Sequence, residues 1–273
     1  MKEALDRMGR EFLRNHPESA VPALEALNPE AAGAFLASVP PKQAGDVLMR
    51  VSPASALSML SFMPVDRIGA IVDHLPVASG AAVLRPLSEA VRRQVLPTLK
   101  SDRAEALTRV LLFPEMTVGA VMDPLYPAFA ADLECGEVIE RLRAGSLKGI
   151  NCLFALNRAL HPIGVARTHD VFLTDSKEKL STILSPCACR VHGRTEWKTV
   201  AADPDLRLWN ALPVVDDENR YIGAFREETL IGLSGHAADQ EESMGWRRTS
   251  LALGEVFRIG LSGILDTIEG EKK

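Results

Sequence analysis

Hydrophobic residues recur at intervals of twelve along the first part of the chain. They occupy the positions Leu27, Val39, Val51, Met63, Leu75, Leu87, Leu99 and Leu111. Between these positions other apolar residues keep helical spacing, as in Ala32, Phe35 and Leu36. Because apolar residues three and four apart share one face of a helix, each unit of twelve predicts a short helix with a single apolar stripe.

The boundaries between units carry helix-start signals. These are Asn28-Pro29, Pro40-Pro41, Ser52-Pro53 and Ser88, which supply either a capping side chain or a proline suited to the first helical turn. A helix of eight or nine residues is marginal alone, because nucleation is costly, so neighbouring helices must stabilise it. We therefore predict that residues from about 20 to 112 form a superhelix of stacked short helices.

After Pro114 the pattern changes to runs of β-forming residues bounded by turns. Asn151 to Leu156 predicts a strand, and Ile163 to Ala166 a returning strand followed by a helix near Thr168. The same order recurs in a second copy, with strands at Asn210–Val215 and Tyr221–Phe225 and a short helix at Arg226–Leu233. A helical stretch precedes each copy, at Glu134–Arg143 and Glu196–Ala202. This half therefore contains one motif twice.

The stretch Leu212–Asp216 followed by Tyr221–Gly223 resembles the paired CBS motif, or Bateman module. With the helical repeats and the junction Phe113–Met122, the chain is similar to the cytosolic part of the MgtE magnesium transporter family. The expected fold is multidomain, α plus α/β. We expect a helical superhelix at 1–116, a tandem CBS pair at 117–235 that divides near residue 180, and a linker with a C-terminal amphipathic helix at 236–273.

Composition narrows the class of protein. Hydrophobic residues make up 47% of the chain and charged residues 25%, which is typical of a folded globular protein. A net charge of −5 argues against a nucleic-acid partner. Four cysteines and a charged amphipathic start indicate neither a disulfide framework nor a signal peptide, so we expect a cytoplasmic protein. No run of apolar residues is long enough to span a bilayer.

The resemblance implies a regulatory unit. In that family the superhelix and the CBS pair hold Mg²⁺ between acidic surfaces and close the attached pore when the ion is plentiful, and the CBS pair dimerises and binds adenine nucleotide. Mg²⁺ and AMP or ATP are therefore the expected ligands, and a homodimer through the CBS pair is the expected assembly. The sequence contains no pore, so the chain is not expected to transport ions by itself.

CBS nucleotide sites carry a glycine, two apolar residues, a hydroxyl residue and an aspartate three positions further on. The first copy keeps the aspartate as Asp170 but has Arg167 in place of the hydroxyl residue. The second copy has Arg226 there, and Thr229 replaces the carboxylate. The resemblance thus implies ribose contact by Asp170 and phosphate contact by the two arginines, with a degenerate second pocket.

Carboxylates are the hard ligands that Mg²⁺ prefers. Among the acidic clusters we select Asp216, Asp217, Glu218 and Glu227 as candidate metal ligands, although Glu115, Asp123, Asp203, Asp205, Glu228 and Asp239–Glu242 offer the same chemistry. Two departures from the family weaken the inherited metal sites: Met116 stands where an acid is usual, and Leu230–Leu233 lacks the usual acids. Cys187, Cys189 and His192 suggest a zinc site with one ligand too few, and reduced structural thiols are favoured.

Motifs for nucleophilic or phosphate-loop chemistry are absent from the sequence, so we expect a protein that is not an enzyme. Near the C-terminus, Leu253, Phe257, Leu261, Ile264 and Ile268 form an apolar stripe at helical spacing. Such a helix docks within the protein, on a dimer mate, or on a membrane protein or other partner, with docking within the protein favoured.

Three hypotheses follow. The first is a homodimeric sensor that responds to Mg²⁺ or adenine nucleotide and controls a partner. The second is an interaction scaffold like the flagellar motor switch protein FliG, with a CBS pair that binds no ligand. The third is a fragment of a full transporter, which a reading frame continuing past Lys273 into apolar helices would reveal.

Overall fold

The computed structural model describes residues 11, 13, 17–145, 149–186 and 190–230. The described residues form two compact units, one up to Glu105 and the other from Ala106 onward. The predicted C-terminal helix at 236–273 lies outside the described residues. In the part that the structure describes, no helix has the length and apolar composition needed to cross a bilayer.

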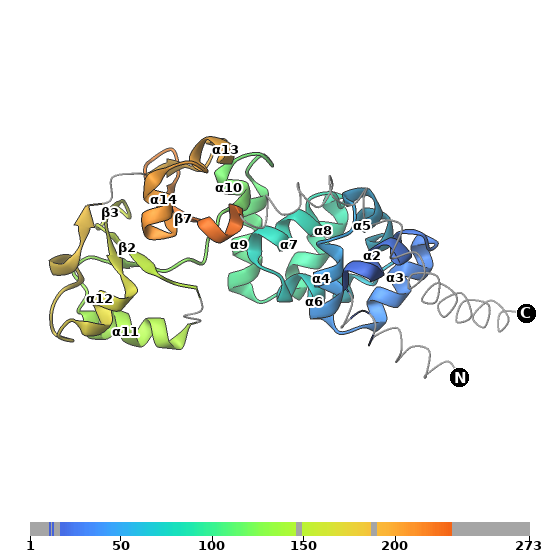
Figure 1. Cartoon of the computed structure of the whole chain (residues 1–273), viewed down its shortest axis with the longest axis horizontal. Coiled ribbons are helices and arrows are strands. Elements are labelled where there is room, and N and C mark those ends of the chain that lie inside the picture. Colours follow the sequence, from blue (N-terminus) through green and yellow to red (C-terminus); the bar gives the residue numbers. More distant parts are fainter. Residues whose placement is uncertain (1–10, 12, 14–16, 146–148, 187–189, 231–273) are drawn as a thin grey trace, which may run out of the picture. The chain divides into compact units, whose positions relative to one another are not determined.

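The first unit is a stack of short helices (Figure 1). The elements are α2 (Pro17–Glu25), α3 (Pro29–Ser38), α4 (Pro41–Leu48), α5 (Pro53–Leu60), α6 (Val65–His74), α7 (Val77–Leu84), α8 (Glu89–Val95), the 3₁₀ turn η1 (Leu96–Thr98) and α9 (Ser101–Leu111), which continues into the second unit. The predicted start signals are confirmed: Asn28 accepts from the backbone N–H of Glu30, and Ser52 and Ser88 cap α5 and α8 in the same way.

The twelve-residue pattern marks the interior of this stack. Six of the eight recurring residues are buried, at Val39, Val51, Met63, Leu75, Leu87 and Leu99. Leu27 and Leu111, at the two ends of the pattern, are only half-buried. This is expected for a solenoid, because an end unit has a neighbour on one side only.

Two features fix the spacing of the helices. A side chain at Gly33 of α3 would place its Cβ 2.5 Å from the carbonyl oxygen of Met59 in α5, so the backbones of these two helices approach closely. Arg67 of α6 donates to the carbonyl of Val39 at the end of α3, and Arg103 of α9 donates in the same way to Leu75 at the end of α6. A cation at a helix C-terminus satisfies free carbonyls there, so each arginine ties together helices three apart in the chain.

The second unit contains two sheets. The first runs in the order β1 (Ala128–Ala130), β2 (Cys152–Leu156), β3 (Pro162–Arg167) and β4 (Ser185–Pro186), and the second in the order β5 (Val191–His192), β6 (Ala211–Val215) and β7 (Tyr221–Arg226). The helices are α10 (Val118–Val121), α11 (Cys135–Ala144), α12 (Thr168–Leu173), α13 (Trp197–Val200) and α14 (Pro204–Trp209), with the 3₁₀ turn η2 (Leu180–Ile183). The predicted strands are confirmed to within a residue at each end, whereas α10, α14, β1, β4 and β5 were not predicted.

The two copies are related by a repeated set of backbone hydrogen bonds. The N–H of Leu180 donates to Leu133, and the N–H of Val118, 62 residues before Leu180, donates to Thr195, 62 residues after Leu133. In both hairpins the inner strand is parallel to one neighbour and antiparallel to the other. Each copy also pairs with the hairpin of the other. β4 of the second copy pairs with β3 of the first, and Asp123 of the first copy forms an isolated bridge with Ala224 of β7 in the second.

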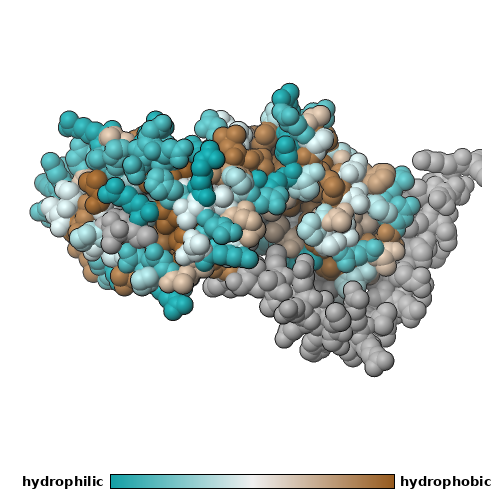
Figure 2. All heavy atoms as spheres, turned by 90° about the horizontal axis from the view of Figure 1, so that it is seen from above, coloured by the Kyte–Doolittle hydropathy of each residue, from teal (hydrophilic) through white to brown (hydrophobic). Residues whose placement is uncertain are grey.

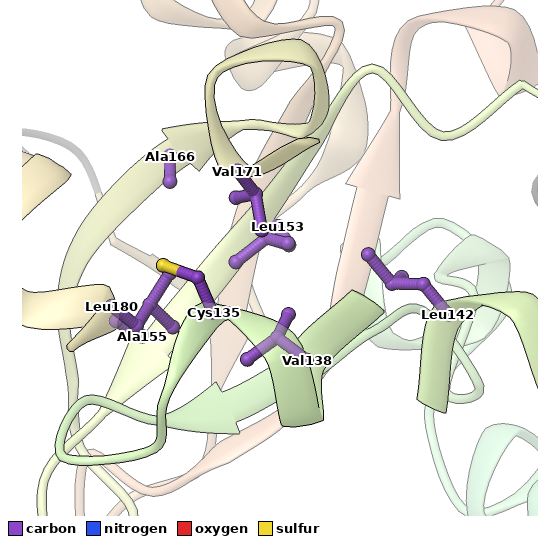
Figure 3. Close-up of a cluster of buried hydrophobic side chains, with 8 residues drawn as sticks. All are labelled: Cys135, Val138, Leu142, Leu153, Ala155, Ala166, Val171 and Leu180. Carbon is purple, nitrogen blue, oxygen red and sulfur yellow. The ribbon is translucent and has the colours of Figure 1, made fainter. Parts of the chain in front are cut away.

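Alternating residues of β2 face two different cores. Leu153 and Ala155 face a cluster formed with Val138 and Leu142 of α11 and with Val171 of α12 (Figure 3). Cys152 and Phe154 point the other way, into a second cluster. That cluster joins residues of both copies, namely Tyr126, Cys152, Phe154, Val165, Ala211 and Ala224. The two copies therefore share this second core.

The surface is mixed in character. On the face seen in Figure 2, apolar residues are interrupted by hydrophilic ones. Large exposed apolar side chains among the described residues include Phe62, Leu112, Leu160, Leu173 and Leu208. Single exposed apolar residues are normal on soluble domains, and these positions by themselves identify no partner.

Candidate functional site

The nucleotide residues predicted from the sequence lie at corresponding ends of the two β-hairpins. Arg167 ends β3 opposite Cys152, and Arg226 ends β7 opposite Ala211. The side-chain amide of Asn151, just before β2, donates to the side-chain oxygen of Asn210, just before β6, at 3.2 Å. The two hairpin ends are therefore adjacent in space.

At the first hairpin end, Arg167 is exposed and its guanidinium lies over the ring of Trp209, 5.1 Å from the ring centroid. Asp170, in the first turn of α12, is also exposed. Between them the hydroxyl oxygen of Thr168 is buried and has no hydrogen-bond partner within the described part of the chain. A buried hydroxyl without a partner is unfavourable, so this end is suited to a ligand that supplies a hydrogen bond.

At the second hairpin end, Arg226 is already engaged, and its side chain is only 15% exposed. It pairs with Asp123 at 3.4 Å and with Glu228 at 2.9 Å, and it donates to the carbonyl of Gly149 at 2.9 Å. Its guanidinium also lies over the ring of Tyr126, 5.5 Å from the centroid. Thr229, predicted as a nucleotide-binding residue of this copy, is half-buried and lies two positions beyond Glu227.

The core beneath both ends is uncharged. The hydroxyl of Tyr126 donates to the carbonyl of Cys152 at 2.8 Å, and the hydroxyl of Tyr221 donates to the carbonyl of Tyr126 at 3.0 Å. Burial raises the pKa of Tyr126, of Tyr221 and of the Cys152 thiol above their ordinary values. These groups are therefore neutral at pH 7, and they hold the hairpins together rather than supplying a reactive side chain.

Three of the four predicted metal ligands lie in the turn between β6 and β7. Asp216 accepts from the backbone N–H of Glu218 at 3.0 Å and of Arg220 at 2.8 Å, and its second oxygen accepts from Arg220 Nε at 2.9 Å. Arg220 also contacts Glu218. Asp217, 77% exposed, lies 3.9 Å from Arg194. Asp216 therefore orders the turn.

The fourth, Glu227, lies at the opposite end of the same hairpin. It accepts from the side-chain amide of Asn210 at 2.6 Å. In the hairpin register Glu227 lies opposite Asn210, six residues before Asp216, which places it about 20 Å from the Asp216–Glu218 turn at roughly 3.3 Å per residue. The structure therefore does not bring the four carboxylates together.

Within the described ranges, no group of three or more histidine, cysteine, aspartate and glutamate side chains is arranged to hold a metal ion. Cys187 and Cys189, considered for zinc, lie outside those ranges, and His192 is exposed in β5. The carboxylates present fit at most a partly hydrated ion held by one or two ligands, which is the usual manner of Mg²⁺.

Comparison with known proteins finds a family that matches the helical repeats. Residues 15–116 match the family model of the MgtE intracellular N domain. The magnesium transporter MgtE of Thermus thermophilus is 28% identical over 147 residues, which is 52% of this chain and 31% of that protein. The match thus spans about a third of the length of this curated relative.

Two solved structures share the fold of most of the chain. One is the cytosolic domain of the Mg²⁺ channel MgtE in complex with ATP, with a TM-score of 0.68 and 23% identity over 82% of this chain and 93% of that one. The other is the soluble part of a magnesium transporter, with a TM-score of 0.62 and 18% identity over 87% of this chain and all of that one. Residues 15–116 therefore match an MgtE-type N domain, and most of the chain shares the fold of these two solved structures, as the order of its sequence motifs predicts.

Two residues of the candidate site were not predicted from the sequence. Trp209 ends α14, a helix that was not predicted, and Thr168 was considered only as the start of a helix. The repeat itself offered a signal for Trp209, because it immediately precedes Asn210, the second-copy counterpart of Asn151.

Proposed function

We propose that this chain is a non-catalytic regulatory module that responds to adenine nucleotide, to Mg²⁺, or to both, and thereby controls a partner. The observation that carries the proposal is the combination of an MgtE-type N domain with a CBS pair. In this proposal the module works in the cytoplasm as a homodimer formed through the CBS pair. A response to ligand requires that the ligand bind two arrangements of the module unequally.

The nucleotide part of the proposal is supported by the residues at the hairpin ends. Arg167 offers a guanidinium suited to phosphate, Asp170 a carboxylate suited to ribose hydroxyls, and Thr168 a hydroxyl in need of a partner. An aromatic ring suited to stacking on a base lies beside them in Trp209. The related cytosolic domain that was solved with ATP has the same fold.

The magnesium part of the proposal rests on exposed carboxylates. Asp217 and Glu218 are 77% and 67% exposed, and Mg²⁺ binding through one of them with several retained waters needs no closed cage. Asp216 is the weaker candidate, because the ion would have to replace the two hydrogen bonds that Arg220 donates to it. Glu227 would act as a separate ligand at the other end of the hairpin.

The partner is proposed to be a protein, including a membrane protein, contacted through the predicted helix at 236–273. The matched relative is a transporter of which this chain spans about a third, so a pore supplied by another part of a longer protein serves the proposal equally well.

One observation favours a second candidate, an interaction scaffold that binds no ligand. Arg226 is held by Asp123 and Glu228 inside the protein, where the family would use the position for a ligand. If both hairpin ends behaved in this way, the CBS pair would serve only to join or dimerise chains.

Thermal unfolding and small-angle X-ray scattering of the full chain separate these candidates. For a regulatory module, millimolar ATP or MgCl₂ raises the Tm by mass action, and at least one of them changes the radius of gyration. If neither ligand changes Tm or shape while a partner protein co-purifies regardless of ligand, the regulatory proposal is wrong and the scaffold is correct.

A further inference from the structure

Both β-hairpins contain a β-bulge at the same place. In the first hairpin the pairing register shifts between Ala155 and Leu156 of β2, which leaves Ile163 of β3 without a partner across the pair. The register shifts at the corresponding place in the second hairpin and leaves Ile222 of β7 in the same situation. A bulge turns the side chain of the extra residue out of the regular alternation of the strand. The two isoleucines are therefore equivalent in the repeat.

In the second copy the bulge is covered from within the second unit. A Cβ at Gly193 would lie 2.6 Å from an edge carbon of the Phe113 ring and 3.2 Å from the terminal methyl of Ile222, so these two side chains meet over the glycine. Arg109, four residues before Phe113, donates a long hydrogen bond of 3.4 Å to the carbonyl of Ile222. An aromatic ring and an arginine thus cover this bulge and leave Ile222 half-buried.

In the first copy the bulge is open. Ile163 is 43% exposed, and Leu160, three residues earlier in the hairpin turn, is 53% exposed. Leu160 has a φ of +63°, a left-handed conformation that leucine rarely adopts, whereas its counterpart Asn219 adopts it at little cost. The carbonyl of Leu160 accepts from the N–H of Tyr221 at 2.9 Å, which holds the turn in place. The first hairpin therefore presents two apolar side chains on a fixed backbone.

The segment that would cover the first bulge carries a charge instead of a ring. Residues 113–121 of the second bulge correspond to 175–183 in the first, because the backbone hydrogen bonds of the two segments match. Asp175 stands where Phe113 stands, and it is exposed. One oxygen of the Asp175 carboxylate accepts from the N–H of Lys177 at 2.9 Å. The first bulge therefore combines apolar surface with an adjacent negative charge.

The two bulges also differ in depth. Phe113 fits between Gly119 and Gly193, where a Cβ would lie 2.4 Å and 2.6 Å from its ring. In the first copy these positions hold Ser181 and Ala131, whose side chains occupy the corresponding space. A ring covering the first bulge must therefore lie on the outer surface of the hairpin, where a segment from outside the sheet is able to reach it.

The chain contains a segment with the matching chemistry. Trp246 is followed directly by Arg247 and Arg248, and all three lie outside the described residues. The other aromatic residue beyond Leu230 is Phe257, which belongs to the apolar stripe of the predicted C-terminal helix. Sixteen residues separate Leu230 from Trp246, and an extended chain of that length reaches about 50 Å, more than the width of a unit of about 130 residues.

We propose that the bulge of the first hairpin, at Leu160, Ile163 and Asp175, binds Trp246 and the arginines after it from the same chain. The indole ring covers the two apolar side chains as a phenylalanine ring does in the second copy, and one arginine pairs with the carboxylate. This docking anchors the start of the predicted C-terminal helix on the second unit. It requires no ligand and therefore goes beyond the proposed function.

Acrylamide quenching of tryptophan fluorescence in the full chain tests it. Trp197→Phe and Trp209→Phe leave Trp246 as the single tryptophan. Trp246 is expected to be quenched at least threefold less than free N-acetyltryptophanamide, because the hairpin shields its ring. Equal quenching of the two overturns the inference.

A change confined to the hairpin surface identifies the shielding residues. Leu160→Asn with Ile163→Thr is expected to raise the quenching of Trp246 at least twofold. Asparagine is the residue of the second copy at this turn, and threonine keeps a β-branched side chain in the strand, so both changes preserve the hairpin. The matched control is Leu125→Ser, at another side chain that is 50% exposed, and it is expected to change nothing. Unchanged quenching in the hairpin variant overturns the proposed surface.

The charged pair has a test of its own. Asp175→Asn keeps an acceptor for the N–H of Lys177 but removes the charge, and it is expected to raise the quenching of Trp246 by a smaller factor. Arg247→Gln with Arg248→Gln is expected to have the same effect. Because both changes remove one ion pair, their combination is expected to add nothing further. Additive increases contradict the pairing.

Mixing chains shows whether the docking is within one chain. Excess tryptophan-free chain with an intact hairpin, made by adding Trp246→Phe, is incubated with the Leu160→Asn, Ile163→Thr protein. Quenching of the remaining Trp246 is expected to stay high, whereas restored shielding shows docking onto another copy and overturns the proposal. None of these outcomes bears on the responses to ATP or MgCl₂ that test the proposed function.

Discussion

The two copies of the motif repeated in the second unit show how one backbone serves two purposes. In the first copy the arginine at the hairpin end is exposed over Trp209, whereas in the second it is bound by Asp123 and Glu228. The backbone hydrogen bonds around the two arginines correspond residue by residue. The repeat therefore specifies the fold twice, while a few side chains decide where a ligand is able to bind.

The largest expected effect comes from the core that the copies share. Phe154 of β2 is 1% exposed, and its ring lies 5.8 Å from those of Tyr126 and Tyr221. Phe154→Ala leaves a cavity between the copies and is expected to lower the free energy of unfolding by about 3–5 kcal/mol. Urea unfolding measures this loss. The control is Phe172→Ala, at a residue that is 37% exposed, which is expected to lower the free energy of unfolding by about 1 kcal/mol or less.

The same experiment tests whether the copies unfold together. We expect both copies to unfold in a single transition that Phe154→Ala shifts as a whole, since Phe154 packs against Tyr221 of the second copy. Two separate transitions, of which only one responds to Phe154→Ala, would contradict a shared core.

A smaller loss of stability is expected at the glycines where a segment of one copy pairs with the hairpin of the other. Gly223 has a φ of +156°, and a Cβ there would lie 2.8 Å from the carbonyl oxygen of Asp123. Gly223→Ala is expected to cost about 2 kcal/mol through backbone strain and crowding. Gly164→Ala, its counterpart without a positive φ, is expected to cost about half as much. Equal losses in chemical unfolding would show that φ plays no part.

Next comes the stability contribution of the two arginines. Arg226→Gln leaves Asp123 and the carbonyl of Gly149 without their cation, and is expected to lower stability by about 1–2 kcal/mol, since these groups are partly exposed. Arg167→Gln, at an exposed side chain, is expected to change stability by no more than about 0.5 kcal/mol. Thermal unfolding of both variants without ligand measures the difference, and a larger loss in Arg167→Gln would reverse the assigned roles.

The smallest effect concerns the two hairpin turns. Asn157 accepts from the N–H groups of Ala159 and His161, as Asp216 accepts from those of Glu218 and Arg220. Desolvation raises the pKa of Asp216, but the hydrogen bonds from Arg220 and Glu218 together outweigh it, so the pKa lies below its usual 3.8. The stabilising contribution of the second copy's turn is therefore expected to depend on pH. That of the first copy's turn is not, because the side chain of Asn157 carries no charge.

The sign follows from the lowered pKa. The ionised form is favoured in the folded protein, so this contribution to stability is present above pH 3.8 and is lost as the pH falls through the lower folded value. Asp216→Asn is expected to cost less than about 1 kcal/mol at pH 7 and nothing at the acid end. A cost that stays constant between pH 7 and pH 3 would show that the charge is irrelevant.

Much of the fold was predictable because local signals agreed. Ser52 and Ser88 cap helices where the sequence places helix starts, and the repeated apolar residues are buried where a stack needs an interior. Leu27 and Leu111 are half-buried because they lie in the end units. The repeat pattern does not show which units lie at the ends, so this difference was not predicted. The strands around Phe154 and Val214 followed from β-forming runs bounded by turns.

The site was only partly predictable, because it depends on contacts between distant positions. Arg226 was predicted to meet phosphate, yet it is bound to Asp123, 103 residues earlier in the chain, and sequence spacing gives no sign of that pairing. The cluster Asp216–Glu218 was selected for its carboxylates, and the hydrogen bonds that Arg220 donates to Asp216 emerge only from the turn geometry. Charge alone does not distinguish a ligand site from an internal ion pair.

A crystal structure of the chain grown with ATP would test the central claim most directly. The account predicts one nucleotide per chain, with its base on Trp209 and a phosphate at Arg167, and with Arg226 still bound to Asp123 and Glu228. A nucleotide at Arg226, or one at each hairpin end, would contradict it.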